Sequence, residues 1–273
     1  MELKNKNIFV DYVDTSLDLN FNWSKEMTSF IEESSKNHFI DIYNRKLVSD
    51  CLKDEFENLG CRFIDLGCSS GYLLEELREK FPGVRIEGGD YEISSLLLAH
   101  QRNPSATLSR IDITKLPFES ESFNNLSCLN VLEHIEEDQQ ALSEIYRILK
   151  PGGRALITVP AGENLMDLYD EVHYHVRRYS KKTLMRKLRT TSFEIEKINY
   201  FASFLYPIFY VIKKLNQVRY KDLTFQQKKE LAMKMSKTHD QSKIMNMVCL
   251  FERMLALRIP LPFGIRLFVL LKK

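Results

Sequence analysis

The residues best suited to acid–base chemistry form one short segment, His173-Tyr174-His175-Val176-Arg177-Arg178-Tyr179. Histidine accepts a proton near neutral pH, and burying so many polar groups is costly unless they meet partners. We therefore predict that His175 is a general base, with His173 second, and that Tyr174 and Tyr179 lie beside the substrate.

The two arginines of this segment can each hold a carboxylate or phosphate through paired hydrogen bonds. Arg177 and Arg178 are therefore predicted to clamp an anionic substrate. The alternative for each is an ion pair with Asp170 or Glu171 that ties the segment to the fold.

A ligand crevice is predicted upstream, where an apolar run ends in Asp65-Leu66-Gly67-Cys68-Ser69-Ser70-Gly71 and leucines then recur at helical spacing. Glycines permit a sharp turn, and the N–H groups that begin the helix point into the crevice. The motif is neither G-x-G-x-x-G nor a P-loop. An acid here repels phosphate and attracts a cation, so the pattern favours an amine-bearing nucleoside.

This stretch resembles the first motif of the class I S-adenosylmethionine-dependent methyltransferases. The resemblance implies that Asp65, Gly67, Cys68, Ser69 and Gly71 contact the cofactor, S-adenosylmethionine, whose product is S-adenosylhomocysteine. Ser69 departs from the family pattern, which usually has a further glycine at this position. The alternative at this position is therefore a loop shifted from its place in the family.

Further cofactor contacts are predicted where the following strands end. Asp90, with Tyr91 next to it, lies 25 residues after Asp65, close to the offset at which an acid meets ribose hydroxyls, and Glu92 is its competitor. The resemblance implies that Asp112 and Ile113 meet the adenine and that Asn130 lies beside the sulfonium. Two further runs strengthen the resemblance: Asn130-Val131-Leu132-Glu133-His134 and Leu149-Lys150-Pro151-Gly152-Gly153. The His-x-Arg-Arg-Tyr segment resembles that of a bacterial subgroup linked to glycan, lipid or natural-product pathways.

Two other residues are predicted near the substrate. His134 acts there either as a base or by orienting its loop. Tyr43, in an amphipathic region from Trp23 to about Leu59, either reaches the ligand or packs as a core aromatic. No metal site is predicted.

The fold class predicted is α/β: a Rossmann-like, doubly wound, seven-stranded sheet whose last strand is antiparallel, with N-terminal helices and a helical insertion between strands six and seven. Residues 1–60 form an irregular arm and lid helices, 61–201 the cofactor-binding core, 202–262 the helical cap and 263–273 the last strand. The helical pattern from Phe225 to about Leu257 belongs to that cap.

Charge is distributed unevenly although the net charge is only +2. Residues 1–179 hold 19 Lys and Arg against 31 Asp and Glu, whereas residues 180–273 hold 20 against 6. This basic third favours an anionic substrate, a membrane surface or simply a solvated helical face. Five cysteines without a C-x-x-C pair and an N-terminus without a signal sequence favour reduced thiols and a cytoplasmic protein, peripheral to the membrane if the cap rests on one.

The function predicted is methyl transfer to oxygen or nitrogen of a small, anionic acceptor. A membrane-surface enzyme acting on a lipid-linked or quinone-like acceptor, and a non-catalytic cofactor-binding subunit, are the alternatives. A nucleic-acid partner is disfavoured, because the residues after Asn130 do not form the Asn-Pro-Pro-aromatic motif of amino-methyltransferases. The oligomeric state is not indicated.

Overall fold

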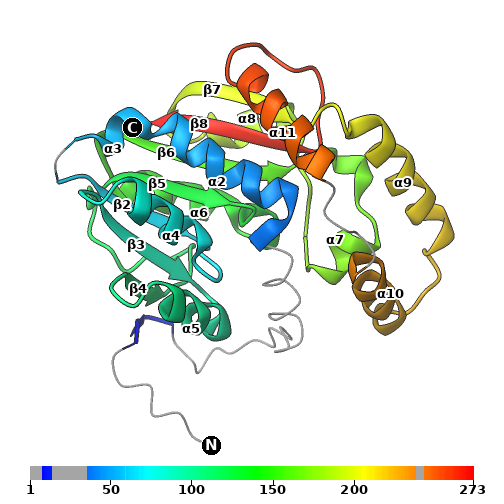
Figure 1. Ribbon diagram of the computed structural model, residues 1–273, viewed down its shortest axis with the longest axis horizontal. Helices are drawn as coiled ribbons and strands as arrows, with labels where there is room; N and C mark the ends of the chain where they lie inside the picture. Colours follow the sequence, from blue (N-terminus) through cyan, green and yellow to red (C-terminus); the bar gives the residue numbers. More distant parts are fainter. Residues whose placement is uncertain (1–7, 14–35, 59, 238–242) are drawn as a thin grey trace, which may run out of the picture.

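The core of the molecule is a mixed sheet with strand order β1-β4-β3-β2-β5-β6-β8-β7 (Figure 1). The computed structural model describes residues 8–13, 36–58, 60–237 and 243–273. The predicted Rossmann-like sheet with an antiparallel last strand is confirmed, because β8 runs antiparallel to both β6 and β7. One correction concerns the N-terminal arm, in which β1 (Val10–Asp11) pairs with β4 and adds an eighth, two-residue edge strand.

Strands and helices alternate from β2 to β4, which is the pattern of a doubly wound fold. The remaining strands are β2 (Arg62–Leu66), β3 (Arg85–Asp90), β4 (Thr107–Arg110), β5 (Phe123–Leu129), β6 (Leu149–Pro160), β7 (Glu194–Phe201) and β8 (Arg266–Lys272). The α-helices are α2 (Phe39–Cys51), α3 (Lys53–Phe56), α4 (Tyr72–Lys80), α5 (Ile93–Arg102), α6 (Asp138–Ile148), α7 (Leu168–Val172), α8 (Lys181–Leu188), α9 (Tyr206–Arg219), α10 (Phe225–Lys237) and α11 (Lys243–Ala256).

Hydrophobic cores cover both faces of the sheet. Successive residues of a strand point to opposite faces, so Phe63 joins the core beneath α2, α4, α5 and α11, whereas Ile64 joins the core beneath α6 and α8. Phe268 and Val269 of β8 divide in the same way. The sheet is therefore buried on two sides.

The strand order reverses between β2 and β5, which both pair with parallel neighbours. In open α/β sheets such a switch point opens a crevice outside the carboxyl ends of the strands. The loop after β2 and the turn after β5, a 3₁₀ helix η2 (Leu132–His134), both lie at this edge.

The segment Lys150-Pro151-Gly152-Gly153 belongs to the start of the long strand β6. Its glycine backbone bonds to the end of the chain, because Gly152 N donates to Lys273 O and Lys273 N to Gly153 O. A Cβ at Gly153 would lie 2.6 Å from the Asn124 carbonyl, so only glycine fits this approach.

The insertion between β7 and β8 contains α9, α10 and α11. Helices α10 and α11 fall within the helical region predicted from Phe225, and residues 238–242 lie outside the described residues. In Figure 1, α9 and α10 lie beside α7 at one end of the sheet, while α11 covers α2 and β7. Of the predicted N-terminal helices, α2 and α3 are described, and residues 14–35 lie outside the described residues.

All five cysteines are free thiols, as predicted. Among the helices of the described ranges, none has the length and apolar character needed to cross a bilayer.

Candidate active site

The glycine loop after β2 is fixed by its own backbone. Gly67 N and Cys68 N both donate to Gly89 O, at 2.7 and 3.0 Å, so the loop is tied to the end of β3. Gly67 has φ +82°, and a Cβ there would lie 2.3 Å from Cγ2 of Val131. This close approach brings the turn after β5 against the loop and requires glycine.

Ser69 adopts the left-handed conformation that a glycine would take, with φ 47°. Its N–H donates to Asp90 Oδ2 at 2.8 Å, and this bond offsets part of the strain of about 1–2 kcal/mol. The departure from the family motif therefore does not unwind the loop.

Asp65 is buried at the end of β2, where its Oδ1 accepts a hydrogen bond from Ser127 Oγ at 2.6 Å. Burial raises the pKa of its carboxyl to about 7, although the Ser127 bond opposes this shift. No cation contacts this carboxylate within the described ranges. An ammonium group is the partner that would relieve the buried charge.

Asp90 lies at the end of β3, directly beside that loop. Its two oxygens accept from Ser69 N and Glu92 N, and burial raises the pKa of its carboxyl. Glu92, the competing acid, caps α5 through Ser94. The neighbouring Tyr91 lies against Arg110, which donates to the Tyr91 carbonyl. Asp90 is thus the acid placed at the crevice.

The residues predicted to meet the adenine follow β4. Asp112 is exposed, and its Oδ1 accepts from both the backbone and the hydroxyl of Thr114. Ile113 is buried in the core under α6. Their contacts with the cofactor stay a prediction.

Asn130 follows β5 with φ 53°, and its buried Oδ1 has no hydrogen-bond partner in the described part of the chain. Leaving a buried hydrogen-bond acceptor unpaired costs free energy, so this position suits a hydrogen-bond donor of a bound ligand. Together with the glycine turn and the cation-free Asp65, this orphaned oxygen fits a bound adenosyl amino acid. Asp65, the 67–71 loop, Asp90 and Asn130 are the residues that would hold it.

Three histidines converge next to this crevice. The rings of His134 and His175 meet edge to face with centroids 4.8 Å apart, and the His173 ring lies 6.1 Å from that of His175. A backbone bond from Val176 N to Glu133 O holds the two segments together. Burial lowers the pKa of His134 to about 3 and that of His175 to about 4, so both are neutral at pH 7.

Each of the two predicted bases has its ring orientation fixed. His175 Nδ1 lies 2.8 Å from Asp170 Oδ1, and His173 Nδ1 lies 2.7 Å from the Tyr169 carbonyl. Both acceptors favour the tautomer with hydrogen on Nδ1, which leaves the lone pair on Nε2. A histidine held by a carboxylate is the arrangement of a general base or a metal ligand.

Asp170 is the hub of a buried charge network. Its oxygens also meet Arg178 Nη1 and Lys213 Nζ, both at 2.7 Å, and Lys213 further contacts Asp167. Burial alone would raise the pKa of the Asp170 carboxyl, but the His175 hydrogen bond and the charges of Lys213 and Arg178 hold it well below its usual range. Helix α9 of the insertion is thereby tied to His175.

The structure gives the arginines and Tyr179 internal partners. Arg178 pairs with Asp170 and donates to the Ala161 carbonyl, the alternative weighed for it. Arg177 pairs with Asp138 rather than with Asp170 or Glu171. The buried Tyr179 hydroxyl donates to Asp138 Oδ2 at 2.7 Å, so this ring supports the fold. Only Arg178 Nη2 is left buried without a partner in this set.

Two further tyrosines were predicted at the substrate. Tyr43 is buried in the core, stacked on Phe201 with ring centroids 4.5 Å apart, which agrees with its core alternative. Tyr174 is half-buried beside Phe225 of α10 and has φ 56°. It is placed at the junction of the histidine segment and the insertion.

Sequence reasoning missed Glu133 and Arg266 as site residues. Glu133 is fully buried, and both its carboxylate oxygens lack partners in the described ranges. Burial raises the pKa of the Glu133 carboxyl to about 7, and the charge of Arg266 on β8 opposes this shift. The buried Nε of Arg266 is itself unpaired there. A lone charge inside an apolar run, as in Leu132-Glu133 and Ile265-Arg266-Leu267, was the available signal.

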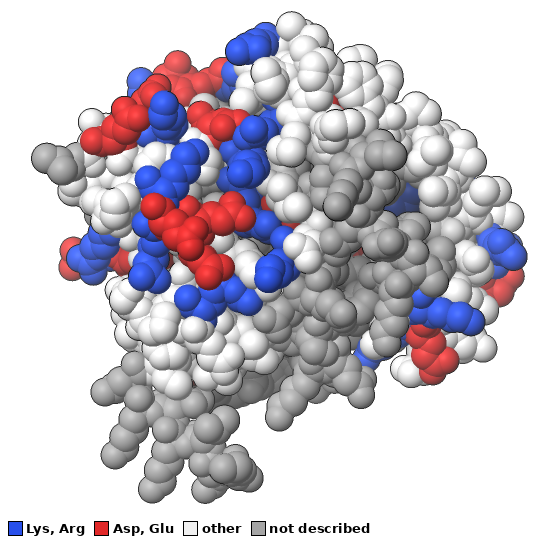
Figure 2. All heavy atoms as spheres, in the orientation of Figure 1, with Lys and Arg blue, Asp and Glu red and all other residues white. Residues whose placement is uncertain are grey.

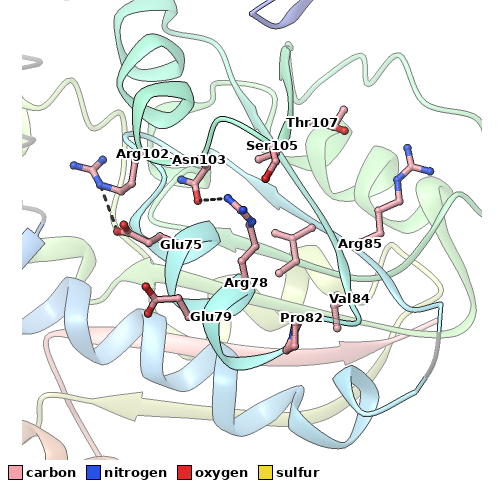
Figure 3. Close-up of a pocket in the computed structure, with 12 residues that line it drawn as sticks. Glu75, Arg78, Glu79, Pro82, Val84, Arg85, Arg102, Asn103, Ser105 and Thr107 are labelled. Carbon is pink, nitrogen blue, oxygen red and sulfur yellow. Dashed lines mark hydrogen bonds and ion pairs between the residues drawn. The ribbon is translucent and has the colours of Figure 1, made fainter.

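A separate groove of about 500 Å³ lies between α4, α5 and the first residues of β3 and β4. In Figure 3, Arg78 points toward Asn103 and Arg102 toward Glu75, so its charges are largely satisfied. Arg85 and Thr107 begin their strands, which places the groove at the edge opposite the crevice. It is not the cofactor site.

Comparison with known proteins agrees with this geometry. Residues 64–157 match the family model described as a methyltransferase domain. The ubiquinone/menaquinone biosynthesis C-methyltransferase of Desulfotalea psychrophila is 29% identical over 118 residues, which cover 42% of this chain and 47% of that protein. The chain thus spans about half the length of this curated relative.

Solved structures show the same fold at low identity. A Haemonchus contortus phosphoethanolamine N-methyltransferase 2, determined with S-adenosyl-L-methionine, is 17% identical with a TM-score of 0.54, over 90% of this chain and 59% of that one. The (4+2)-cyclase SpnF is 19% identical with a TM-score of 0.55, over 84% and 81%. The chain therefore carries a class I S-adenosylmethionine-dependent methyltransferase domain, with residues 64–157 as its matched core.

Proposed function

We propose that this protein transfers a methyl group from S-adenosylmethionine to an oxygen or nitrogen of a small, anionic acceptor. The observation that carries the proposal is the Asp170–His175 pair, which stands beside His134 at the same sheet edge as the glycine loop and Asn130. A cofactor domain alone would not require a carboxylate-oriented histidine there.

The chemistry divides between cofactor and protein. When bound, the cofactor supplies a methyl group already activated by its sulfonium, so alignment accounts for much of the rate. An acceptor O–H or N–H still has to lose its proton as the new bond to carbon forms and the carbon–sulfur bond breaks. His175 Nε2 takes that proton, and Asp170 stabilises the imidazolium that results.

The anionic character of the acceptor rests on Arg266 and Arg178. Each guanidinium has a buried nitrogen without a partner among the described residues, Nε in one and Nη2 in the other. Burial and the charge of Arg178 lower the pKa of Arg266, which shows that the two cations are close. A carboxylate or phosphate of the acceptor would relieve both.

A membrane-surface enzyme is the second candidate, and one observation favours it. Helix α9 exposes an apolar stripe at helical spacing, formed by Ile208, Val211, Ile212, Leu215 and Val218, with exposures of 44–77%. The upper-right surface in Figure 2, over α9 and α11, carries few charges. A lipid-facing stripe would suit a quinone-like acceptor, the class named for the Desulfotalea relative.

The first test is calorimetric titration of the protein with S-adenosylhomocysteine, followed by transfer of a tritiated methyl group to hydroxybenzoates and to a demethylated menaquinol in detergent. We expect micromolar binding and turnover that is lost in His175→Ala and reduced in Asp170→Asn, with cofactor affinity unchanged in both. Binding without turnover on any such acceptor would favour the non-catalytic alternative. Absence of binding would refute the proposal itself.

Flotation with vesicles tests the second candidate. The full chain should float with vesicles of phosphatidylglycerol and phosphatidylcholine, and Val211→Ser with Leu215→Ser should abolish flotation without changing turnover on a water-soluble acceptor. Equal flotation of both proteins would exclude the α9 stripe as the contact.

A further inference from the structure

A group of potential metal ligands lies beside the proposed acceptor site and is not used by the cofactor contacts. One ligand atom each of Glu133, His134 and His175 lies within 4.8 Å of the other two. Glu133 and His134 belong to η2 after β5, and His175 follows α7, so the fold brings together residues about 40 positions apart in sequence.

The state of Glu133 indicates a missing cation. Its side chain is fully buried, and neither oxygen has a hydrogen-bond partner within the described ranges. Leaving a buried carboxylate oxygen unsatisfied costs about 1–3 kcal/mol, and more when it is charged. Arg266 and Arg178 are near enough to influence it, yet no ion pair within 4 Å joins either to Glu133 in this part of the chain.

The hydrogen bonding of His175 also indicates a bound cation. Its Nδ1 is held by Asp170, so Nε2 is the ring nitrogen left to bind an ion beside Glu133 and His134. A ligating histidine in proteins usually donates its other N–H to a carboxylate or carbonyl in this way.

We propose that Glu133, His134 and His175 bind one divalent transition-metal ion, represented here by Zn²⁺. Two imidazoles and one carboxylate suit Zn²⁺, Mn²⁺ or Fe²⁺, whereas Mg²⁺ and Ca²⁺ prefer oxygen ligands throughout. At metal–ligand bonds of about 2.1 Å the ligand atoms lie about 3.0–3.4 Å apart, so the side chains draw together on binding.

Three protein ligands leave at least one coordination position open. Glu133 follows Asn130 by three positions and lies near Arg178. The open position is therefore assigned to the acceptor of the proposed reaction, on which this part of the inference rests. The acceptor class it fits is a molecule whose reacting hydroxyl is flanked by a second oxygen, so that both oxygens bind the ion. A bound ion lowers the pKa of such a hydroxyl.

Metal binding changes the roles of the histidines. The ion takes the His175 lone pair that serves as the base in the metal-free protein. His173 then remains as the base, with its own Nε2 lone pair set by the Tyr169 carbonyl. The acceptor proton passes to His173, and no other reactant is required.

The test measures metal binding without any methyl acceptor, so it is independent of the proposed function. Zn²⁺ is titrated by calorimetry into protein dialysed against chelator, and Co²⁺ is added in parallel to record its visible absorption. We expect one site with a micromolar or tighter Kd, weakened at least tenfold in Glu133→Gln and in His134→Ala, and loss of the Co²⁺ bands in both. His173→Ala is the matched control and should bind Zn²⁺ as the parent does.

Thermal unfolding confirms that each variant is folded. If His134→Ala does not fold, Glu133→Gln still tests the site, because glutamine keeps the shape of the glutamate side chain. Absence of a stoichiometric site, or Zn²⁺ affinity and Co²⁺ bands unchanged in a folded Glu133→Gln, would overturn the proposal. Loss of binding in His173→Ala with normal binding in Glu133→Gln would do the same. Metal binding without methyl transfer would leave this site standing and count against the proposed function alone.

Discussion

The buried carboxyl of Asp65 makes the stability of the metal- and cofactor-free protein depend on pH. Burial raises its folded-state pKa to about 7 from an ordinary value of 3.8, so the folded state binds a proton more tightly than the unfolded chain. A raised acid pKa means that stability is greatest at low pH and is lost as pH rises through about 7. A shift of about three units corresponds to at most about 4 kcal/mol.

Replacing Asp65 by Asn removes this dependence and keeps an acceptor for Ser127 Oγ. We expect the free energy of unfolding of Asp65→Asn to exceed that of the parent at pH 8, with a gain about 2 kcal/mol larger than at pH 5. Urea unfolding at both pH values, without cofactor, measures the difference. The same variant should bind S-adenosylhomocysteine more weakly, because the ammonium loses its anionic partner.

Asp112→Asn is the matched control, an acid at the same sheet edge that is exposed. Asp112→Asn should not reproduce the gain of Asp65→Asn at pH 8, because it removes no buried carboxyl. If the gain in Asp65→Asn is independent of pH, the carboxyl is not perturbed by burial and the reasoning is refuted.

Three further changes test other parts of the site. Ser69→Gly should raise the free energy of unfolding by up to about 1 kcal/mol, by relieving the left-handed serine, with cofactor affinity unchanged; a loss of stability in urea unfolding would contradict the strain. Asp90→Asn should weaken S-adenosylhomocysteine binding at least tenfold by calorimetry, and near-normal affinity would remove Asp90 from the ribose site. Lys213→Met should destabilise the protein by about 3–5 kcal/mol in the same unfolding assay, because it removes the buried cation that Asp167 and Asp170 share. A loss under 1 kcal/mol would show that water already screens the network.

Local patterns were enough to predict the cofactor half of this protein. The apolar run before Asp65, the glycines after it and the acid at Asp90 are each short-range signals, and a parallel sheet brings the ends of its strands to one edge. The seven main strands and the antiparallel end of the sheet were implied by the resemblance to the methyltransferase family, and the structure confirms them. The two-residue strand at Val10 did not, because it is too short to show periodicity.

The acceptor half was predicted only in part. The segment from His173 to Tyr179 was found from its composition, but composition could not say which side chains face inward. Arg177 and Tyr179 are held by Asp138, and Tyr43 is stacked on Phe201, so these residues support the fold.

The sequence by itself determined the family, the order of the elements and the loop that suits S-adenosylmethionine, because these depend on residues close together along the chain. Only the tertiary structure decided the partners of Asp170, which come from α9 and from the segment after α7, and the meeting of Glu133 and His134 with His175. The Asp170–Lys213 pair and the meeting of Glu133 with His175 each join residues about 40 positions apart. Charge pairing across that distance has no periodic signature in a single sequence, so it had to be read from the fold.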